Sequence, residues 1–171
     1  MVEWTGATYA DCPTVEVEIW IDAPPERVWP VVSDIGAIPG MSPELRAAEY
    51  CDGGAGGPAV GRSFSGTNRH PAIGEWTTTS YIVTCDEPRV FEWAVTDPAN
   101  PTSSWRFTLE TRDGGTLLRQ WFRMGPAPSG LSAAIERMPD KEQKIVHRRL
   151  GEHEAGMNAT VAAIKEKAER A

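Results

Sequence analysis

The stretch Val15–Asp34, VEVEIWIDAPPERVWPVVSD, combines two kinds of hydrophobic periodicity on either side of a pair of prolines. Its first half has the period-two pattern of a strand with one buried face, and the apolar set is Val15, Val17, Ile19 and Ile21. Pro24 and Pro25 end the strand, and both can occupy the first turn of a helix, where a missing N–H is tolerated. Apolar residues at helical spacing follow: Val28, Val31, Val32 and Ile35. The stretch therefore predicts a strand that runs directly into a short helix.

This junction resembles the N-terminal signature of the START-like superfamily, the polyketide cyclase and Bet v 1-like proteins. In those proteins a first strand is followed by a helix with the pattern A-P-x-E-x-V-W. The matching residues in this sequence are Ala23, Pro24, Glu26, Val28 and Trp29.

Length and charge limit the classes of protein that the chain can belong to. The sequence has 171 residues and a formal net charge of -7. We expect one domain over residues 14–168, large enough to fold on its own core, after an N-terminal extension over residues 1–13. Nucleic acid is not an expected partner, because phosphate binding requires a concentrated basic face.

The cysteines and the N-terminal residues bear on the compartment. Cys12, Cys51 and Cys85 are odd in number and lack the spacing of a disulfide framework or a zinc site. The first residues have no basic and apolar leader pattern, and no apolar stretch is long enough to span a membrane. These patterns favour a cytoplasmic protein without a metal or other cofactor.

Most of the remaining sequence is typical of an antiparallel meander followed by a long helix. A short turn near Gly40 and a glycine-rich hairpin tip at residues 51–61 are predicted early in the chain. The predicted later strands are 44–50, 61–70, 75–84, 89–96, 103–112 and 116–124. A short helix is predicted over residues 131–138 and a long one over 141–168, with Asp140 and Gln143 spaced like a capping box.

The order of these elements extends the START-like resemblance from Val15 to Lys165. It implies an α+β helix-grip fold, in which a curved seven-stranded antiparallel sheet wraps around a long C-terminal helix and two short helices follow the first strand. A single helix cannot fill such a curved sheet, so a cavity between them is expected.

Alternation along the strands predicts which large side chains face that cavity. The expected inward-facing apolar residues are Phe64, Trp76, Phe91, Trp93, Trp105, Phe107, Phe122 and Met124 from the sheet, and Met157 from the long helix. Two interpretations stay open, because so many rings can form either the wall of a ligand cavity or a packed core.

Polar residues that share this inward direction are better candidates for a binding site, because an apolar core has little use for them. They are Asn68, Thr78, Ser80 and Gln120. The direction of the strand at 75–84 is ambiguous, since Tyr81 and Val83 fit an inward face equally well. On the long helix, Arg149 and His153 lie near the apolar stripe, where they either face the cavity or extend to solvent.

Three functions are compatible with these features. The first is binding of an apolar small molecule, lipid, polyketide or aromatic, by a carrier, sensor or cyclase-like protein. The second is a polyketide aromatase/cyclase that catalyses aldol closure and dehydration without a cofactor, with His153, Arg149 and Tyr81 as candidate catalytic residues. The third is a protein-interaction module with an exposed apolar surface built from Trp4, Trp20 and Trp121, which a homodimer explains more simply than a foreign partner. A monomer or homodimer is expected.

Overall fold

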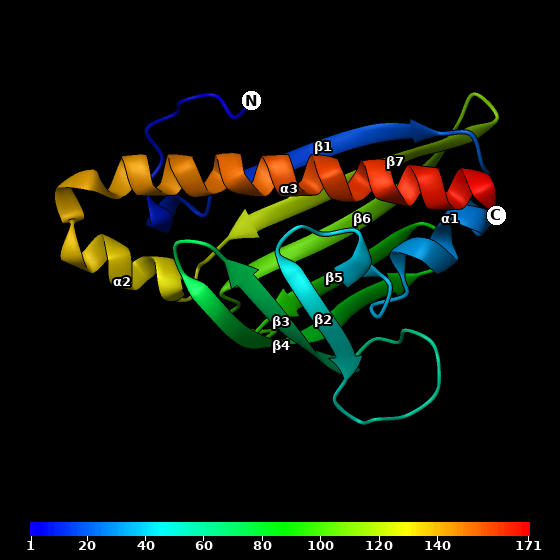
Figure 1. Cartoon of the computed structure of the whole chain (residues 1–171), viewed down its shortest axis with the longest axis horizontal. Helices are drawn as coiled ribbons and strands as arrows, with labels where there is room; N and C mark the ends of the chain where they lie inside the picture. Colours follow the sequence, from blue (N-terminus) through cyan, green and yellow to red (C-terminus); the bar gives the residue numbers. More distant parts are fainter.

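A computed structural model describes the whole chain, residues 1–171, as one antiparallel sheet with helices on one side (Figure 1). The strands are β1 (Thr14–Ile21), β2 (Leu45–Tyr50), β3 (Ser63–His70), β4 (Gly74–Asp86), β5 (Val90–Val95), β6 (Ser103–Arg112) and β7 (Gly115–Met124). The α-helices are α1 (Pro25–Val32), α2 (Gly130–Arg137) and α3 (Glu142–Arg170). Single 3₁₀ turns are η1 (Tyr9–Asp11), η2 (Ile38–Gly40) and η3 (Pro139–Lys141).

The seven strands are hydrogen-bonded in the order β1-β7-β6-β5-β4-β3-β2, and every neighbouring pair is antiparallel. Strands β2 to β7 follow one another as a meander, and β1 returns to pair with β7, with Val17 opposite Gln120. Register shifts occur between Ile82 and Thr84 in β4 and between Leu45 and Ala47 in β2. Such bulges bend a strand and help a sheet to curve.

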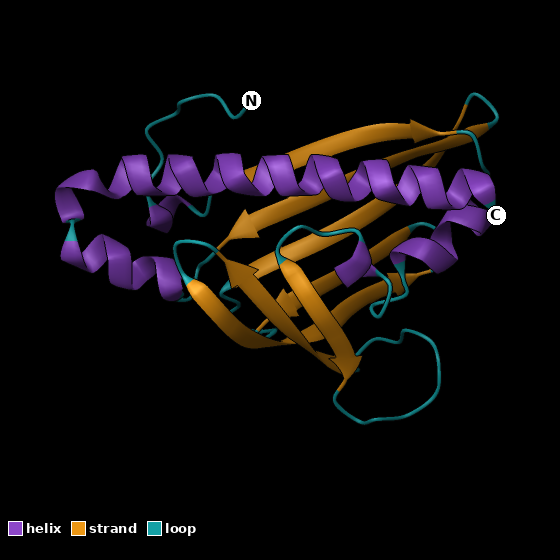
Figure 2. Cartoon of the chain, in the orientation of Figure 1, coloured by secondary structure: helices purple, strands orange, loops and turns teal.

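Helix α3 crosses the concave face of this sheet along its full length (Figure 2). Its closest packing is with β1, at one edge of the sheet, and with α1. The buried stripe that makes these contacts contains Val146, Leu150, Met157, Thr160, Val161, Ile164 and Ala168. This is the helix-grip arrangement predicted from the sequence. The predicted capping box is wrong, because η3 precedes α3 and no side chain caps the first residue of the helix.

One half of the concave face is closed by α1. The ring of Trp29 packs edge-on against Phe91, with the ring centroids 6.2 Å apart, and both side chains are buried. Phe107, Leu118 and Ile164 are also buried in this cluster. The closed half of the core therefore lies at the end of the sheet where β1 passes into α1.

The N-terminal segment packs on the opposite end of α3. The Tyr9 N–H donates to the Glu142 carboxylate at 3.0 Å, and the Tyr9 hydroxyl donates to the Ala127 carbonyl at 2.7 Å. The terminal ammonium of Met1 forms an ion pair with Glu154 at 3.1 Å. These contacts tie the segment to α3 and to the connection between β7 and α2.

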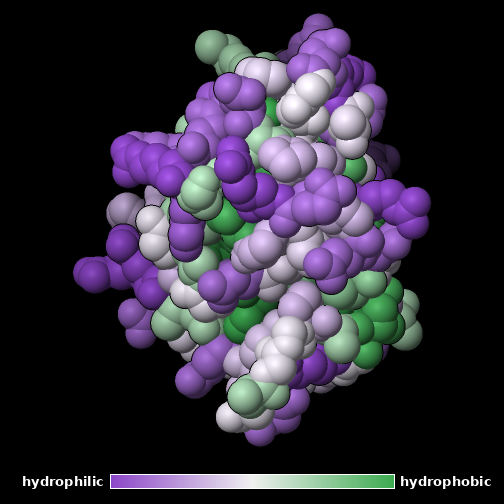
Figure 3. All heavy atoms as spheres, turned by 90° about the vertical axis from the view of Figure 1, so that its right-hand side faces the viewer, coloured by the Kyte–Doolittle hydropathy of each residue, from purple (hydrophilic) through white to green (hydrophobic).

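The end of the molecule that carries the C-terminus has a mostly polar surface (Figure 3). Seen from the end that carries the C-terminus, hydrophilic side chains dominate and hydrophobic ones form small areas between them (Figure 3). None of the helices combines the length and the apolar character needed to cross a lipid bilayer.

The junction between β1 and β7 leads to a test of packing. A Cβ atom on Gly115 would lie 2.3 Å from the Ile21 carbonyl oxygen and 2.8 Å from the Trp20 ring. We expect Gly115→Ala to lower the free energy of unfolding by about 2 kcal/mol, because the backbone must shift to relieve the overlap. Urea denaturation followed by tryptophan fluorescence measures this change.

Gly40→Ala is the matched control, since no atom lies within 4 Å of the added Cβ there. Equal stabilities of the two variants would contradict the close packing at Gly115.

Candidate ligand-binding site

A cavity of about 570 Å³ lies between α3, α2 and the concave face of the sheet. It occupies the half of the molecule that α1 does not fill. Of its 31 lining residues 13 are hydrophobic, so the wall mixes apolar and polar groups. This volume is in the range that holds a small organic molecule.

Aromatic rings form a continuous part of the wall. The rings of Trp93 and Trp105 are stacked, with centroids 6.3 Å apart and planes inclined by 9°. Phe122 packs against Trp105 at 4.6 Å, and Phe64 meets Trp93 edge-on at 6.1 Å. Trp93, Trp105 and Phe122 occupy directly paired positions on the neighbouring strands β5, β6 and β7. Phe64 lies on β3, which β4 separates from β5. The result is an aromatic surface on one side of the cavity, in which the planes of Trp93 and Trp105 are parallel and those of Phe122 and Phe64 are inclined to them.

Gln120 is a polar interruption in the buried face of β7. It lies between Leu118 and Phe122 along the strand, and its side chain lines the cavity. The side-chain oxygen Oε1 is buried and has no hydrogen-bond partner in the protein. Because an unpaired buried acceptor is destabilising, a turn of the Gln120 amide that brought this oxygen to a donor on a bound molecule would be favourable.

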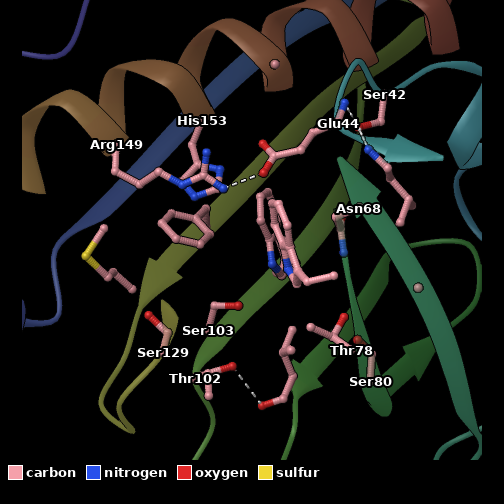
Figure 4. Close-up of a pocket in the computed structure, with 18 of the residues that line it drawn as sticks. Ser42, Glu44, Asn68, Thr78, Ser80, Thr102, Ser103, Ser129, Arg149 and His153 are labelled. Atoms are coloured by element: carbon pink, nitrogen blue, oxygen red, sulfur yellow. Dashed lines mark hydrogen bonds and ion pairs between the residues drawn. The ribbon is translucent and has the colours of Figure 1, made fainter. Parts of the chain in front are cut away.

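Hydroxyl and amide groups cover another part of the cavity wall (Figure 4). They come from β3, β4, β6 and the neighbouring loops, and the labelled set is Ser42, Asn68, Thr78, Ser80, Thr102, Ser103 and Ser129. Groups of this type donate and accept hydrogen bonds without carrying charge. This side of the cavity can orient a molecule that has several oxygen atoms.

His153 projects from α3 into the cavity (Figure 4). Its ring lies on Phe122, with centroids 4.2 Å apart, and edge-on to Trp105 at 5.2 Å. Burial, the positive charge of Arg149 and the neighbouring His70 hold the pKa of His153 well below its usual value, with burial as the largest cause. The imidazole is therefore neutral near pH 7 and can accept a proton from an acidic C–H or O–H group.

Arg149, one turn before His153, belongs to a chain of charged side chains. Its guanidinium contacts Glu44 at 2.5 Å and Glu152 at 3.1 Å, and Glu152 in turn contacts His70 at 3.3 Å. The side chain of Arg149 is 12% exposed, so it does not extend into solvent. These ion pairs join α3 to the adjoining ends of β2 and β3.

Most of the residues predicted to face a cavity line this one. They are Phe64, Asn68, Trp76, Thr78, Ser80, Trp93, Trp105, Gln120, Phe122, Met124, Arg149, His153 and Met157. The ambiguity in β4 is resolved by Ser80 and Thr78, which line the cavity while Tyr81 does not.

Three of the predicted residues need correction. Tyr81 does not line the cavity, because it follows the inward-facing Ser80 and successive side chains point to opposite faces of a strand. Phe91 and Phe107 do face inward, but they are fully buried in the closed half of the core and do not reach the cavity. Alternation along β5 and β6 therefore predicted correctly that Phe91 and Phe107 lie on the concave face of the sheet, but not that they lie in its closed half.

The sequence analysis missed several lining residues. Ser103 shares its strand face with Trp105, so its alternation could have identified it. Glu44 and Ser129 lie in connections, and Glu152 is one residue from His153 on a polar part of α3. No local pattern marks these three, because their positions depend on how α3 lies across the sheet.

The three tryptophans proposed for a protein-interaction surface each pack against a nitrogen-bearing side chain. The ring centroids of Trp4 and His147 are 5.1 Å apart. The Cζ atom of Arg106 lies 4.4 Å from the centroid of the Trp121 ring, and the Nζ atom of Lys165 lies 5.4 Å from that of the Trp20 ring. Trp4 and Trp20 are partly exposed. The structure has no group of three or more side chains placed to hold a metal ion.

Comparisons with known proteins agree with the fold. The family model described as polyketide cyclase/dehydrase and lipid transport matches residues 13–151. A polyketide cyclase-like protein of Corynebacterium glutamicum, solved by NMR, is 29% identical, with a TM-score of 0.62 and 91% of each chain covered. No curated protein sequence matches the chain significantly.

Two aromatase/cyclases share the fold at lower identity. The Zhui aromatase/cyclase of Streptomyces sp. R1128 is 19% identical, with a TM-score of 0.67, and 92% of this chain and 94% of that one are covered. The di-domain protein StfQ of the steffimycin biosynthetic pathway is 13% identical, with a TM-score of 0.71. The similarity covers 92% of this chain and 50% of StfQ. At these identities the likeness concerns the fold alone.

The lowered pKa of His153 predicts how stability depends on pH. Below the ordinary histidine pKa of about 6.5, the unfolded chain binds a proton at this position and the folded chain does not. The free energy of unfolding should therefore fall as the pH decreases from about 6.5 toward the lowered pKa. His153→Gln should remove this part of the decrease in urea denaturation measured across that pH range.

His147→Gln removes a histidine from the same helix outside the cavity and serves as the control. If His153→Gln left the pH dependence of the wild-type protein unchanged, His153 would not be the neutral buried group described here.

Proposed function

The chain belongs to the family described as polyketide cyclase/dehydrase and lipid transport, and from this membership we propose that it binds an apolar aromatic small molecule bearing a hydrogen-bond donor in the cavity under α3. The membership agrees with the START-like resemblance of the Ala23–Trp29 junction. The observation that carries the proposal is the unpaired Oε1 of Gln120 in an aromatic wall.

The apolar part of the wall supports a flat ligand. The stacked Trp93 and Trp105 and the adjoining Phe122 present ring faces and edges rather than flexible side chains. Rings pack against rings in offset or edge-on geometries, so an aromatic ligand gains both buried apolar area and favourable ring contacts. Met124 and Met157 adapt to the outline of the ligand, because methionine has several rotatable bonds.

The polar groups support a ligand that carries oxygen substituents. Gln120 offers a buried acceptor, which suits a phenol or enol hydroxyl. The hydroxyl groups of Thr78, Ser80 and Ser103 supply further neutral contacts. A saturated hydrocarbon chain would leave all of these groups unpaired, at a cost in binding free energy.

Binding of 1-naphthol and naphthalene tests the role of Gln120. We expect wild-type protein to bind 1-naphthol about tenfold more tightly than naphthalene, because only the naphthol donates to Gln120. Gln120→Leu should remove this difference. Titration monitored by quenching of the cavity tryptophans measures both affinities.

Thr111→Val, at a site outside the cavity, is the control and should keep the preference for naphthol. Absence of binding by both compounds would contradict a ligand cavity. Equal affinities of wild-type protein for 1-naphthol and naphthalene would contradict the role of Gln120 but not the ligand cavity.

A second candidate, an aromatase/cyclase, is favoured by the neutral His153 in the aromatic wall. In such a reaction His153 would take a proton from a CH₂ group between two carbonyls of a poly-β-ketone. The resulting carbanion would attack a distant carbonyl carbon to form the ring C–C bond, and the protonated imidazole would return the proton to the new alkoxide. Loss of water then gives the aromatic ring. Arg149 would not assist the uptake of the proton, since its charge favours the neutral imidazole over the protonated one.

Turnover is tested with a synthetic poly-β-ketone thioester and analysis of the products by mass spectrometry. His153→Ala should lower the rate at which cyclised product forms by about 100-fold, the usual contribution of a general base to a reaction rate. Tyr81→Phe, on the other face of β4, should match wild type. A His153→Ala variant with an unchanged rate and product profile would leave binding without this chemistry.

A further inference from the structure

The cavity contains an unbalanced set of charges. Among its lining residues only Glu44, Arg149 and Glu152 carry a full charge, since His153 is neutral near pH 7. These three lining side chains together carry one net negative charge, and the exposed Arg148, which lies outside the lining, also pairs with Glu152. This sign matches that of the whole chain, whose formal net charge is -7.

Arg149 is held by both carboxylates at once. Its Nη2 atom donates to Glu44 at 2.5 Å, and its Nη1 atom donates to Glu152 at 3.1 Å. Both terminal nitrogens of the only cationic side chain in the wall are therefore already engaged with a carboxylate. Figure 4 shows Glu44 reaching Arg149 from the sheet side of the cavity.

The two carboxylates are not equivalent. Glu152 also contacts the exposed Arg148 at 3.2 Å and His70 at 3.3 Å. Glu44 has Arg149 as its one ion-pair partner, and its side chain is 23% exposed. Arg149 is therefore the one cation that compensates for the charge of Glu44, whereas Glu152 also pairs with Arg148.

This arrangement determines what an anionic ligand would meet. A carboxylate or sulfonate that leaves water for an apolar cavity needs a cation to compensate for the lost hydration. Arg149 keeps further N–H donors, but its charge is already balanced by Glu44 and Glu152, and an anion placed beside it would be repelled by both carboxylates. A neutral ligand of the same shape meets no such penalty, and repulsion of the wrong ligand is a common source of specificity.

We propose that Glu44 and Glu152 are specificity-determining residues that make this cavity select neutral aromatic ligands over anionic ones. The inference rests on the proposed function, because it assumes that the cavity binds a small molecule. It adds a discrimination by charge to the recognition of shape and of the hydroxyl group.

Two fluorescent probes with one ring skeleton test this inference. N-phenyl-1-naphthylamine is neutral, and 8-anilinonaphthalene-1-sulfonate is the same skeleton with a sulfonate. Wild-type protein should bind the neutral probe about tenfold more tightly than the sulfonate. Glu44→Gln and Glu152→Gln should each raise the affinity for the sulfonate, relative to that for the neutral probe, by about tenfold. The double variant should favour the sulfonate further, because its wall carries a net positive charge.

Two further variants make the test specific. Glu166→Gln removes one carboxylate from an exposed part of α3 outside the cavity, so it should keep the wild-type affinity ratio. Adding Arg149→Met to Glu44→Gln should cancel the gain in sulfonate binding, since that gain depends on the released guanidinium. Binding of the neutral probe shows in each variant that the cavity is intact.

The outcomes separate the two proposals. If wild-type protein bound neither probe, the proposed ligand cavity would fail, and this inference with it. If both probes bound and the ratio stayed the same in the single and double glutamate variants, the cavity would stand and the role of Glu44 and Glu152 would be overturned. An equal rise of the ratio in Glu166→Gln would also overturn it, because overall charge would then explain the effect.

Discussion

The packing of α1 against the concave face of the sheet divides the inside of this protein in two. Trp29 of α1 meets Phe91, and Phe107 and Ile164 are buried in the same cluster, so this half is a closed core. Nothing equivalent fills the other half, because α3 packs most closely on β1 at the edge of the sheet and α2 lies across the far end. The cavity is the space that this arrangement leaves.

The cavity has three chemical regions with different physical roles. The stacked Trp93 and Trp105 supply apolar area, and the hydroxyl groups with Gln120 supply neutral hydrogen-bonding positions. The third region is the ion-pair chain through Arg149. A partly buried charge of this kind is stable only with its partners in place, so these ion pairs fasten α3 to the segment before β2. Under the selectivity proposed above they would also limit the charge of a ligand.

Much of the fold could be predicted because its signals are local. The alternation in β1 and the proline junction each depend on a few neighbouring residues. The strands predicted over 103–112 and 116–124 are present as β6, which ends at Arg112, and β7, which begins at Gly115. The face of each strand was also largely predictable, as Trp105 and Gln120 show. Tyr81 was not, because β4 has apolar or neutral side chains on both faces and only its pairing with β3 and β5 selects one.

By itself, the sequence determined the order of the elements, the family and the direction of most inward side chains, since strand and helix periodicities are properties of the local backbone. The tertiary structure alone decided where the core ends and the cavity begins. Phe91 and Trp93 have the same inward alternation on β5, yet the first is covered by Trp29 and the second lines the cavity. It also decided that Glu44 meets Arg149, which lies 105 residues away in the chain. Such contacts depend on where α1 and α3 pack on the sheet, and no periodicity within one element records that placement.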